Sequence, residues 1–278
     1  MTALARDWPT LARWLIFPGV NLHARLRNAR LPAHFGSARP GEARRVLDAG
    51  CGNGMLAYQS CLRGNHVLAI TVKDREVAGC RALFNRWLGI GPERLAFEKR
   101  NLYELELADA SLDEVICTEV LEHLKMDELV CRKFWAALKP GGVLHVTAPN
   151  ATHPYNRAFP LDPAESGGHV RSGYTPEDYR ALLKPIGFRI AAVEPLGGPV
   201  RQLFNRLIKE VQARFGAAAG LPLFALALPA LSFESRRRER ACPFAWYVKA
   251  VKPAETALDA RRVAAQPADD RIESPVTG

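Results

Sequence analysis

Short apolar segments that alternate with helical segments are the feature that most constrains the fold of this chain. We expect strands at residues 45–49, 66–72, 94–98, 112–118, 143–148, 188–194 and 244–251. Helices are expected between most of them, at 55–63, 75–88 and 120–138 and from the Thr175-Pro176 start signal to about residue 187. Apolar strands separated by helices form parallel sheets covered on both faces. The sequence therefore predicts a doubly wound α/β fold with a mostly parallel, seven-stranded sheet.

The rest of the chain is divided by composition. Residues 1–43 mix aromatic residues with arginines and predict a helical N-terminal cap, while 195–240 predict a helical insertion or lid within the main domain, 44–253. Residues 254–278 are polar and without period, which predicts a disordered tail. The apolar run at 11–17 is too short for a signal peptide, so none is expected.

Charge and cysteine content limit the environment of the protein. The formal charge of +9 permits nucleic acid, an anionic membrane surface or an anionic substrate as a partner, without choosing among them. The six cysteines include no C-x-x-C pair, which predicts a reduced, cytoplasmic protein with neither disulfides nor a zinc site.

A glycine-rich turn follows the first expected strand, in the stretch VLDAGCGNGM at 46–55. Its glycines are spaced G-x-G-x-G, whereas the dinucleotide fingerprint G-x-G-x-x-G needs its third glycine where this chain has Met55. Asp48 stands two residues before the first glycine, where a carboxylate would repel a pyrophosphate and suit a cationic group. The loop therefore favours a nucleotide-like cofactor that carries a positive charge.

Four motifs in order carry a resemblance to a known family. VLDAGCGNG, HVLAITV, ICTEVLEHL and ALKPGGVLHVTAPN each end at the mouth of an expected strand, and together they resemble the class I S-adenosylmethionine-dependent methyltransferases. The resemblance runs from about Val46 to Gly187 and implies a Rossmann-like methyltransferase domain over 44–253. It also implies S-adenosylmethionine as cofactor.

The resemblance assigns cofactor contacts residue by residue. Asp48 would meet the methionine ammonium, Gly50 and Gly52 would admit the cofactor to the backbone, and Gly54 would let the next helix pack closely. The full implied set is Asp48, Gly50, Cys51, Gly52, Asn53, Gly54, Thr71, Asp74, Asn101, Leu102, Thr118 and Glu119.

Two positions depart from the family pattern. Thr71 stands where most members carry an acid for the ribose hydroxyls, so that either Asp74 substitutes or Thr71 makes a weaker bond. Asn101 replaces the usual aspartate near adenine, and its amide can still bond the adenine edge.

The expected catalytic candidates are His123, His169 and Glu119. Glu119, Glu122 and His123 are spaced i, i+3, i+4, which would place them on one face of the helix after the fourth strand, and His169 lies in a glycine-flanked loop expected to cover that strand end. The set resembles that of some metal-dependent O-methyltransferases, which act on ubiquinone precursors or on the terminal ribose of small RNAs. A divalent metal such as Mg²⁺, a metal-free histidine base and a purely structural role all remain open.

The acceptor is predicted only by class. The fourth strand ends in Cys117-Thr118-Glu119-Val120, without the [DN]-P-P-[YF] of amino-group methyltransferases, and no RNA-binding module is recognisable, so nucleic acid is not an expected partner. The insertion combines a basic amphipathic segment at 201–209 with an uncharged stretch at 215–233 and the arginine-rich 236–240. It is expected to be a lid or a peripheral contact with an anionic membrane, and not a span, because a single crossing would separate the last strand from its sheet.

We therefore predict O-methylation of a small or lipid-linked metabolite, such as a cell-surface glycan, a lipid or a secondary metabolite. A cyclopropane-type C-methyltransferase acting on lipid would also fit Thr71 and the apolar insertion. A ribose methyltransferase of RNA and a non-catalytic protein that binds S-adenosylmethionine are the remaining alternatives. The sequence leaves the acceptor, the metal and the oligomeric state open.

Overall fold

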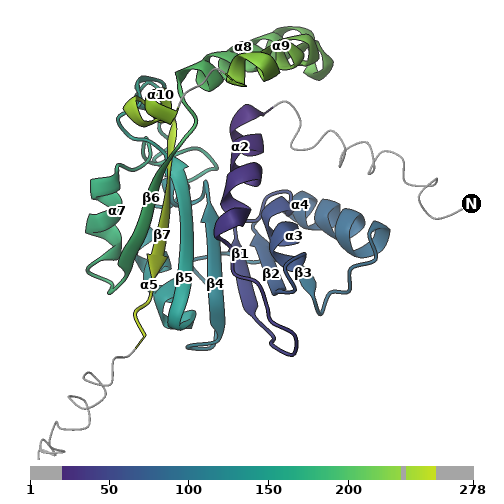
Figure 1. The fold of residues 1–278 in the computed structure, drawn as a ribbon, viewed down its shortest axis with the longest axis vertical. Helices are drawn as coiled ribbons and strands as arrows, with labels where there is room; N and C mark the ends of the chain where they lie inside the picture. Colours follow the sequence, from purple (N-terminus) through teal and green to yellow (C-terminus); the bar gives the residue numbers. More distant parts are fainter. Residues whose placement is uncertain (1–20, 233–235, 255–278) are drawn as a thin grey trace, which may run out of the picture.

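A seven-stranded sheet forms the centre of the protein in the computed structural model, which describes residues 21–232 and 236–254. Its strand order is β3-β2-β1-β4-β5-β7-β6 (Figure 1). All pairs from β3 to β5 are parallel, and β7 is antiparallel to both β5 and β6. The strands are β1 (Arg45–Ala49), β2 (His66–Thr71), β3 (Leu95–Lys99), β4 (Leu112–Thr118), β5 (Leu138–Pro149), β6 (Arg189–Leu196) and β7 (Ala245–Val251). The predicted fold class is confirmed.

Helices cover both faces of the sheet and bury two apolar layers. One layer holds Phe134, Tyr179 and Leu183 of α5 and α7, and the other holds residues of α2, α3 and α4. The helices of the main body are α2 (Leu22–Arg30), α3 (Met55–Cys61), α4 (Asp74–Cys80), α5 (Asp127–Ala137), α6 (Pro154–Arg157) and α7 (Pro176–Leu183). The main body also contains the 3-10 helices η2 (Leu31–His34) and η4 (Leu121–His123). The π-helical segment η3 (Arg81–Trp87) extends α4.

The prediction of one continuous helix over 120–138 is wrong. After β4 the backbone enters the left-handed region at Glu119, where φ is 56°, and the Glu119 N–H donates to the carbonyl of Thr147. A left-handed residue tied to the neighbouring strand cannot continue into an α-helix. The chain therefore makes only the turn η4 before α5 begins at Asp127.

The segment before β1 is fixed to the sheet through the buried carboxylate of Glu114 on β4. Glu114 accepts hydrogen bonds from the Gly36 N–H at 2.9 Å and from the Arg44 guanidinium at 3.0 Å. His145 Nε2 lies 3.2 Å from its other oxygen, and His145 Nδ1 lies 2.7 Å from the Tyr247 hydroxyl. This chain of polar groups joins the described part of the predicted N-terminal cap to β4, β5 and β7; residues 1–20 of that cap lie outside the described residues.

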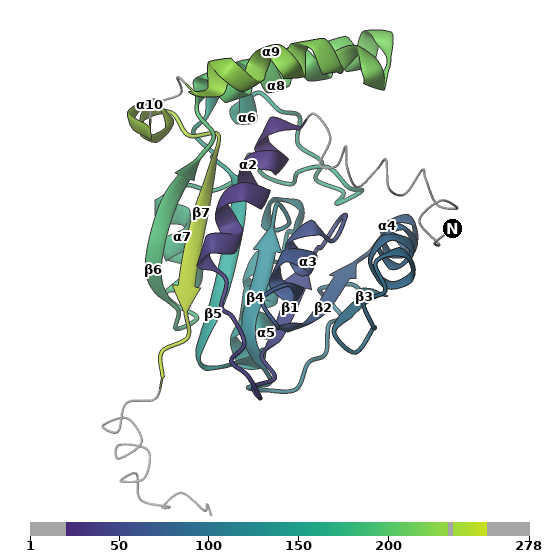
Figure 2. The same cartoon turned by 45° about the vertical axis from the view of Figure 1, so that its right-hand side comes forward.

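A helical hairpin is inserted between β6 and β7. It contains α8 (Pro199–Phe215), η5 (Ala217–Gly220) and α9 (Leu221–Ser232), and α10 (Arg236–Ala241) follows before β7. Figures 1 and 2 show α8 and α9 extending along one end of the molecule, beyond the carboxyl ends of the parallel strands. In the described parts of the chain, no helix is both long and apolar enough to cross a bilayer. The tail predicted to be disordered lies outside the described residues from position 255 onward.

Candidate active site

The candidate site lies where the sheet order reverses, between β1 and β4. β1 pairs in parallel with β2 on one side and with β4 on the other, so the loops after β1 and β4 leave the sheet in opposite directions and open a crevice at its carboxyl edge. Open α/β sheets bind their ligands in such a crevice. The glycine-rich loop, Glu119 and η4 all lie at this edge because they directly follow these two strands.

The glycine-rich loop is shaped by contacts on one side and open on the other. The N–H groups of Gly50 and Cys51 both donate to the Ile70 carbonyl, and the Asn53 side chain accepts from the Met55 N–H. At Gly50, where φ is +82°, a Cβ would lie 2.3 Å from Val120 Cγ2, so only glycine fits. A Cβ on Gly52 would meet no atom of the described residues within 4 Å, which leaves this part of the loop open to a ligand.

Asp48 presents a buried carboxylate beneath this loop. Its side chain is 1% exposed, and Oδ2 has no hydrogen-bond partner among the residues that the structure describes. Burial raises its pKa from 3.8 to about 7, and a hydrogen bond from the Ala57 backbone only partly opposes that rise. A buried carboxylate without a partner needs a cation to be stable in its charged form. The methionine ammonium of S-adenosylmethionine would supply one.

Glu76 lies at the candidate site and was not predicted from the sequence. Its Oε2 accepts a hydrogen bond of 2.6 Å from Thr71 Oγ1 at the end of β2, so an acid does lie beside the position where the family usually carries one. Asp74, the expected substitute, is instead exposed and paired with Lys99 at 2.6 Å. One sequence signal could have identified Glu76. It is an acid in the first turn of the expected helix, and that turn brings residue 76 close to Thr71.

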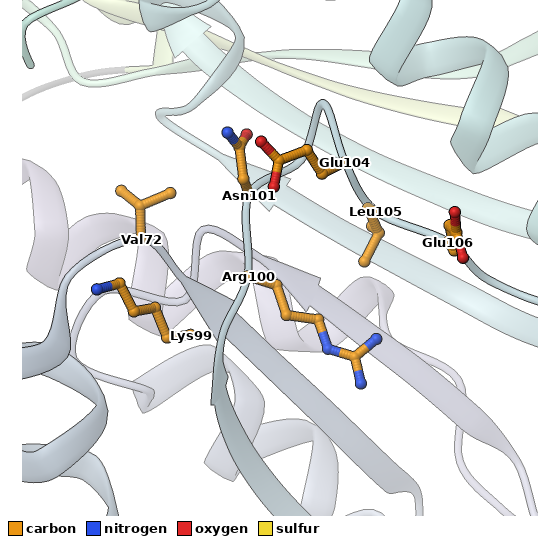
Figure 3. A pocket seen from close by; sticks show the side chains of 7 residues that line it. All are labelled: Val72, Lys99, Arg100, Asn101, Glu104, Leu105 and Glu106. Carbon is orange, nitrogen blue, oxygen red and sulfur yellow. The ribbon is translucent and has the colours of Figure 1, made fainter.

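A cavity of about 670 Å³ opens beyond the ends of β2 and β3. Figure 3 shows the side chains that line it, which are those of Val72, Lys99, Arg100, Asn101, Glu104, Leu105 and Glu106. Asn101, predicted to contact the cofactor, is among the residues that line this cavity. The Leu102 side chain, which was also expected at the cofactor, is buried in the core and is not among the lining residues.

Glu119, which follows Thr118 at the end of β4, is held between two partners. Its Oε1 accepts from Thr147 Oγ1 at 3.1 Å, and its Oε2 lies 3.3 Å from the guanidinium of Arg27 on α2. Arg27 was not expected at the site, because nothing in the sequence distinguishes it from the other arginines of the N-terminal segment. The N-terminal helix thus contributes directly to the edge where β4 ends.

Glu122, His123 and His169 are brought together, although η4 rather than an α-helix positions the first two. One ligand atom of each lies within 4.8 Å of those of the others. Glu122 is 1% exposed, and neither of its oxygens has a hydrogen-bond partner in the described residues. Burial, and then the negative charge of Glu119, raise the pKa of Glu122.

The two imidazoles of this cluster are arranged edge to face. Their ring centroids are 4.7 Å apart, and His123 Nδ1 lies 2.8 Å from the Gly168 carbonyl in the loop that carries His169. Nδ1 must therefore donate, which leaves Nε2 of His123 as the proton acceptor. Burial, and then the neighbouring His123, lower the pKa of His169. One carboxylate with two imidazoles is also a donor set that suits a divalent metal ion.

The chain is similar in sequence to several known methyltransferases. The family described as "Methyltransferase domain" matches residues 47–146. An O-methyltransferase of Aspergillus sclerotiorum is 26% identical over 59% of this chain and 62% of its own length. A protein of Mycolicibacterium smegmatis, named as a probable S-adenosylmethionine-dependent methyltransferase, is 32% identical over 53% of this chain and 52% of its own. A sterol 24-C-methyltransferase of Eremothecium gossypii is 28% identical over 54% and 41%.

A solved structure shares the whole fold. The S-adenosylmethionine-dependent methyltransferase of Mesorhizobium loti superposes with a TM-score of 0.56 at 19% identity, over 83% of this chain and 99% of that one. The chain therefore contains a methyltransferase domain over residues 47–146 and has the fold of the class I S-adenosylmethionine-dependent methyltransferases. The matches span about half the length of the curated relatives, so they show the cofactor-binding domain and not a particular acceptor.

Replacing Asp48 with asparagine is expected to stabilise the free protein at high pH. Because the folded-state pKa of Asp48 is raised to about 7, the stability that its protonated form contributes is fully present below 3.8 and is lost as the pH rises through 7. In urea unfolding, the free energy of unfolding of Asp48→Asn should equal that of the wild type at about pH 4. At about pH 8 it should exceed the wild-type value by about 4 kcal/mol.

Asp109→Asn, a change at an exposed acid away from the site, is the matched control and should leave the pH dependence unchanged. If the free energy of unfolding changed with pH in the same way for the wild type and Asp48→Asn, ionisation of Asp48 would not destabilise the protein.

Proposed function

We propose that this chain is an S-adenosylmethionine-dependent methyltransferase that transfers a methyl group to an oxygen of a small or lipid-linked metabolite. The observation that carries the proposal is the buried carboxylate of Asp48, whose Oδ2 has no hydrogen-bond partner among the described residues, below an open glycine loop where the sheet order reverses. A ligand with an ammonium group and a nucleoside fits that loop and the cavity beyond it.

The residues around the crevice would divide the cofactor between them. Asp48 would pair with the ammonium, Glu76 would accept from the sugar hydroxyls, and Asn101 would bond the edge of the adenine. The bound cofactor supplies an electrophilic methyl group on a sulfonium. Since methyl transfer is an in-line displacement, holding the acceptor in line would contribute much of the rate.

Oxygen acceptors must also lose a proton, and His123 is the best-placed base. Its Nδ1 is committed to the Gly168 carbonyl, so Nε2, which lies 4.0 Å from Glu122 Oε1, is the nitrogen left to accept the hydroxyl proton. Glu119 is already paired with Arg27 and Thr147, which suits it to hold the acceptor rather than to take its proton. The edge-to-face contact with His169 would keep the His123 ring in position.

A divalent metal ion is a second candidate feature of the same site. Both oxygens of Glu122 are buried and accept no hydrogen bond from the described residues, and Oε1 lies 4.0 Å from His123 Nε2 in the group that also contains His169. Such an ion would lower the pKa of an acceptor hydroxyl, and these three residues would hold it. In that arrangement Nε2 of His123 would be a ligand and not a base.

The acceptor chemistry draws its support from the relatives. The Aspergillus sclerotiorum relative is named for O-methylation, whereas the Eremothecium gossypii relative is named for methylation of a sterol carbon. A histidine poised to accept a proton at the end of β4 favours the hydroxyl acceptor. Product analysis distinguishes methylation of a hydroxyl from methylation of a lipid carbon.

Transfer of label from S-adenosylmethionine carrying a radioactive methyl group tests this function. The purified protein is incubated with quinols, phenols and lipid-linked sugars, and products are identified by mass spectrometry. We expect methyl ethers, a loss of turnover of at least about 10²-fold in His123→Ala with cofactor binding retained, and no change in the control His66→Ala. Cofactor binding without transfer to any acceptor, or full activity of His123→Ala, would contradict the proposal.

Chelation tests the metal. If Glu122, His123 and His169 hold a required ion, EDTA should abolish turnover and Mg²⁺ or another divalent ion should restore it. Glu122→Gln should raise the metal concentration needed by at least about tenfold, whereas Glu128→Gln, at an exposed acid paired with Arg132, should not. Unchanged turnover of protein shown by elemental analysis to be metal-free would leave His123 as a base without metal.

A further inference from the structure

The second helix of the hairpin, α9, is apolar on every side. Its sequence, LPLFALALPALS, contains no charged residue. Leu223, Phe224 and Leu231 pack inward with the buried Ala227 against Ile208 and Leu22. The outer face is formed by Leu221, Leu226 and Leu228, which are 50%, 61% and 51% exposed. A surface helix normally presents polar residues to solvent, so this outer face indicates a binding surface.

The helices before and after α9 in the chain are rich in basic residues. The adjacent helix α8 carries Arg201, Arg206, Lys209 and Arg214 and only one acid, Glu210. Arg206 is paired with Glu210, whereas Lys209 and Arg214 are exposed. The sequence of α10, RRRERA, adds four arginines and one glutamate. An apolar helix face next to a basic helix complements a bilayer interface that contains anionic lipid.

We propose that the α8–α9 hairpin docks on an anionic bilayer, with the outer face of α9 among the lipid chains near the headgroups and the basic residues at the phosphates. α9 has twelve residues and would be about 18 Å long. That length is short of the roughly 30 Å hydrocarbon core, and Pro229 lies inside the helix, which suits a helix lying in the interface. A second copy of the chain is a poorer occupant, because a two-fold contact would bring the same basic residues together.

Helix α2 contacts both the α8–α9 hairpin and the candidate active site. The Leu22 N–H donates to Asn205 of α8, the Arg25 guanidinium lies 4.8 Å from the ring centroid of Phe224 in α9, and Arg27 reaches Glu119. Both surfaces lie toward the carboxyl edge of the sheet (Figure 2). A docked hairpin would therefore turn the acceptor side of the crevice toward the membrane. That last step rests on the proposed function; the docking itself does not.

Sedimentation with vesicles tests the docking without any acceptor or cofactor. The full chain is mixed with vesicles of phosphatidylcholine alone, or of phosphatidylcholine and phosphatidylglycerol in equal parts. We expect binding to the anionic vesicles only, reduced by about 0.5 M NaCl. The double variant Leu226→Glu/Leu228→Glu should lose at least about tenfold in vesicle affinity.

Leu62→Glu is the matched control, because Leu62 is 65% exposed and lies just after α3, shortly before the amino end of β2. It should bind vesicles as the wild type does. The proposal is overturned if wild-type protein that binds S-adenosylmethionine does not bind anionic vesicles, or if Leu62→Glu and the α9 variant lose binding equally. Light scattering that shows a dimer disrupted by the α9 variant, without vesicle binding, would assign the surface to a second copy. Because cofactor binding is measured separately, failure of docking leaves the proposed methyl transfer untouched.

Discussion

The buried carboxylate of Asp48 determines what the cofactor end of this site can bind. A carboxylate at this depth is costly in its charged form, and that cost is recovered only when a cation enters. The glycine loop above it is open at Gly52, so a cation attached to a larger ligand can reach it. S-adenosylmethionine carries such a group, and Glu76 and Asn101 follow β2 and β3, the strands next to β1 in the sheet.

Two buried acids, Asp48 and Glu114, differ in their partners, and this difference is the reason for proposing Asp48 as the cofactor contact. Both are 1% exposed and both lie on central strands. Burial alone would raise the pKa of Glu114, but its contacts with His145, the Gly36 N–H and Arg44 hold it below its usual value. Among the described residues, only the Ala57 backbone opposes the effect of burial on Asp48, and the pKa of Asp48 is raised. Perturbed groups of the second kind concentrate at functional sites, and Glu122 is another at the end of the neighbouring strand.

Local sequence patterns predicted the frame of the site but not its side chains' partners. β1 and β4 have the expected bounds, because buried parallel strands read as short apolar runs, and the glycine loop follows from its spacing. The left-handed backbone at Glu119 could not be predicted, since a glutamate in that conformation is held by the neighbouring strand and not by its own propensity. Arg27 and Glu76 reach the site through packing of α2 and α4, which depends on residues far away in the chain. The exposed face of α9 could not be predicted either, because it depends on which residues of α9 pack against Ile208 and Leu22.

The most direct test of the cofactor site is a crystal structure of the protein with S-adenosylhomocysteine, which keeps the ammonium and the nucleoside but has no methyl group to transfer. We predict that the ligand's amino group lies within hydrogen-bond distance of Asp48 Oδ2, with the sugar hydroxyls facing Glu76 and the adenine beside Asn101. A ligand bound elsewhere, with Asp48 still unpaired beneath the loop, would contradict this assignment of the crevice.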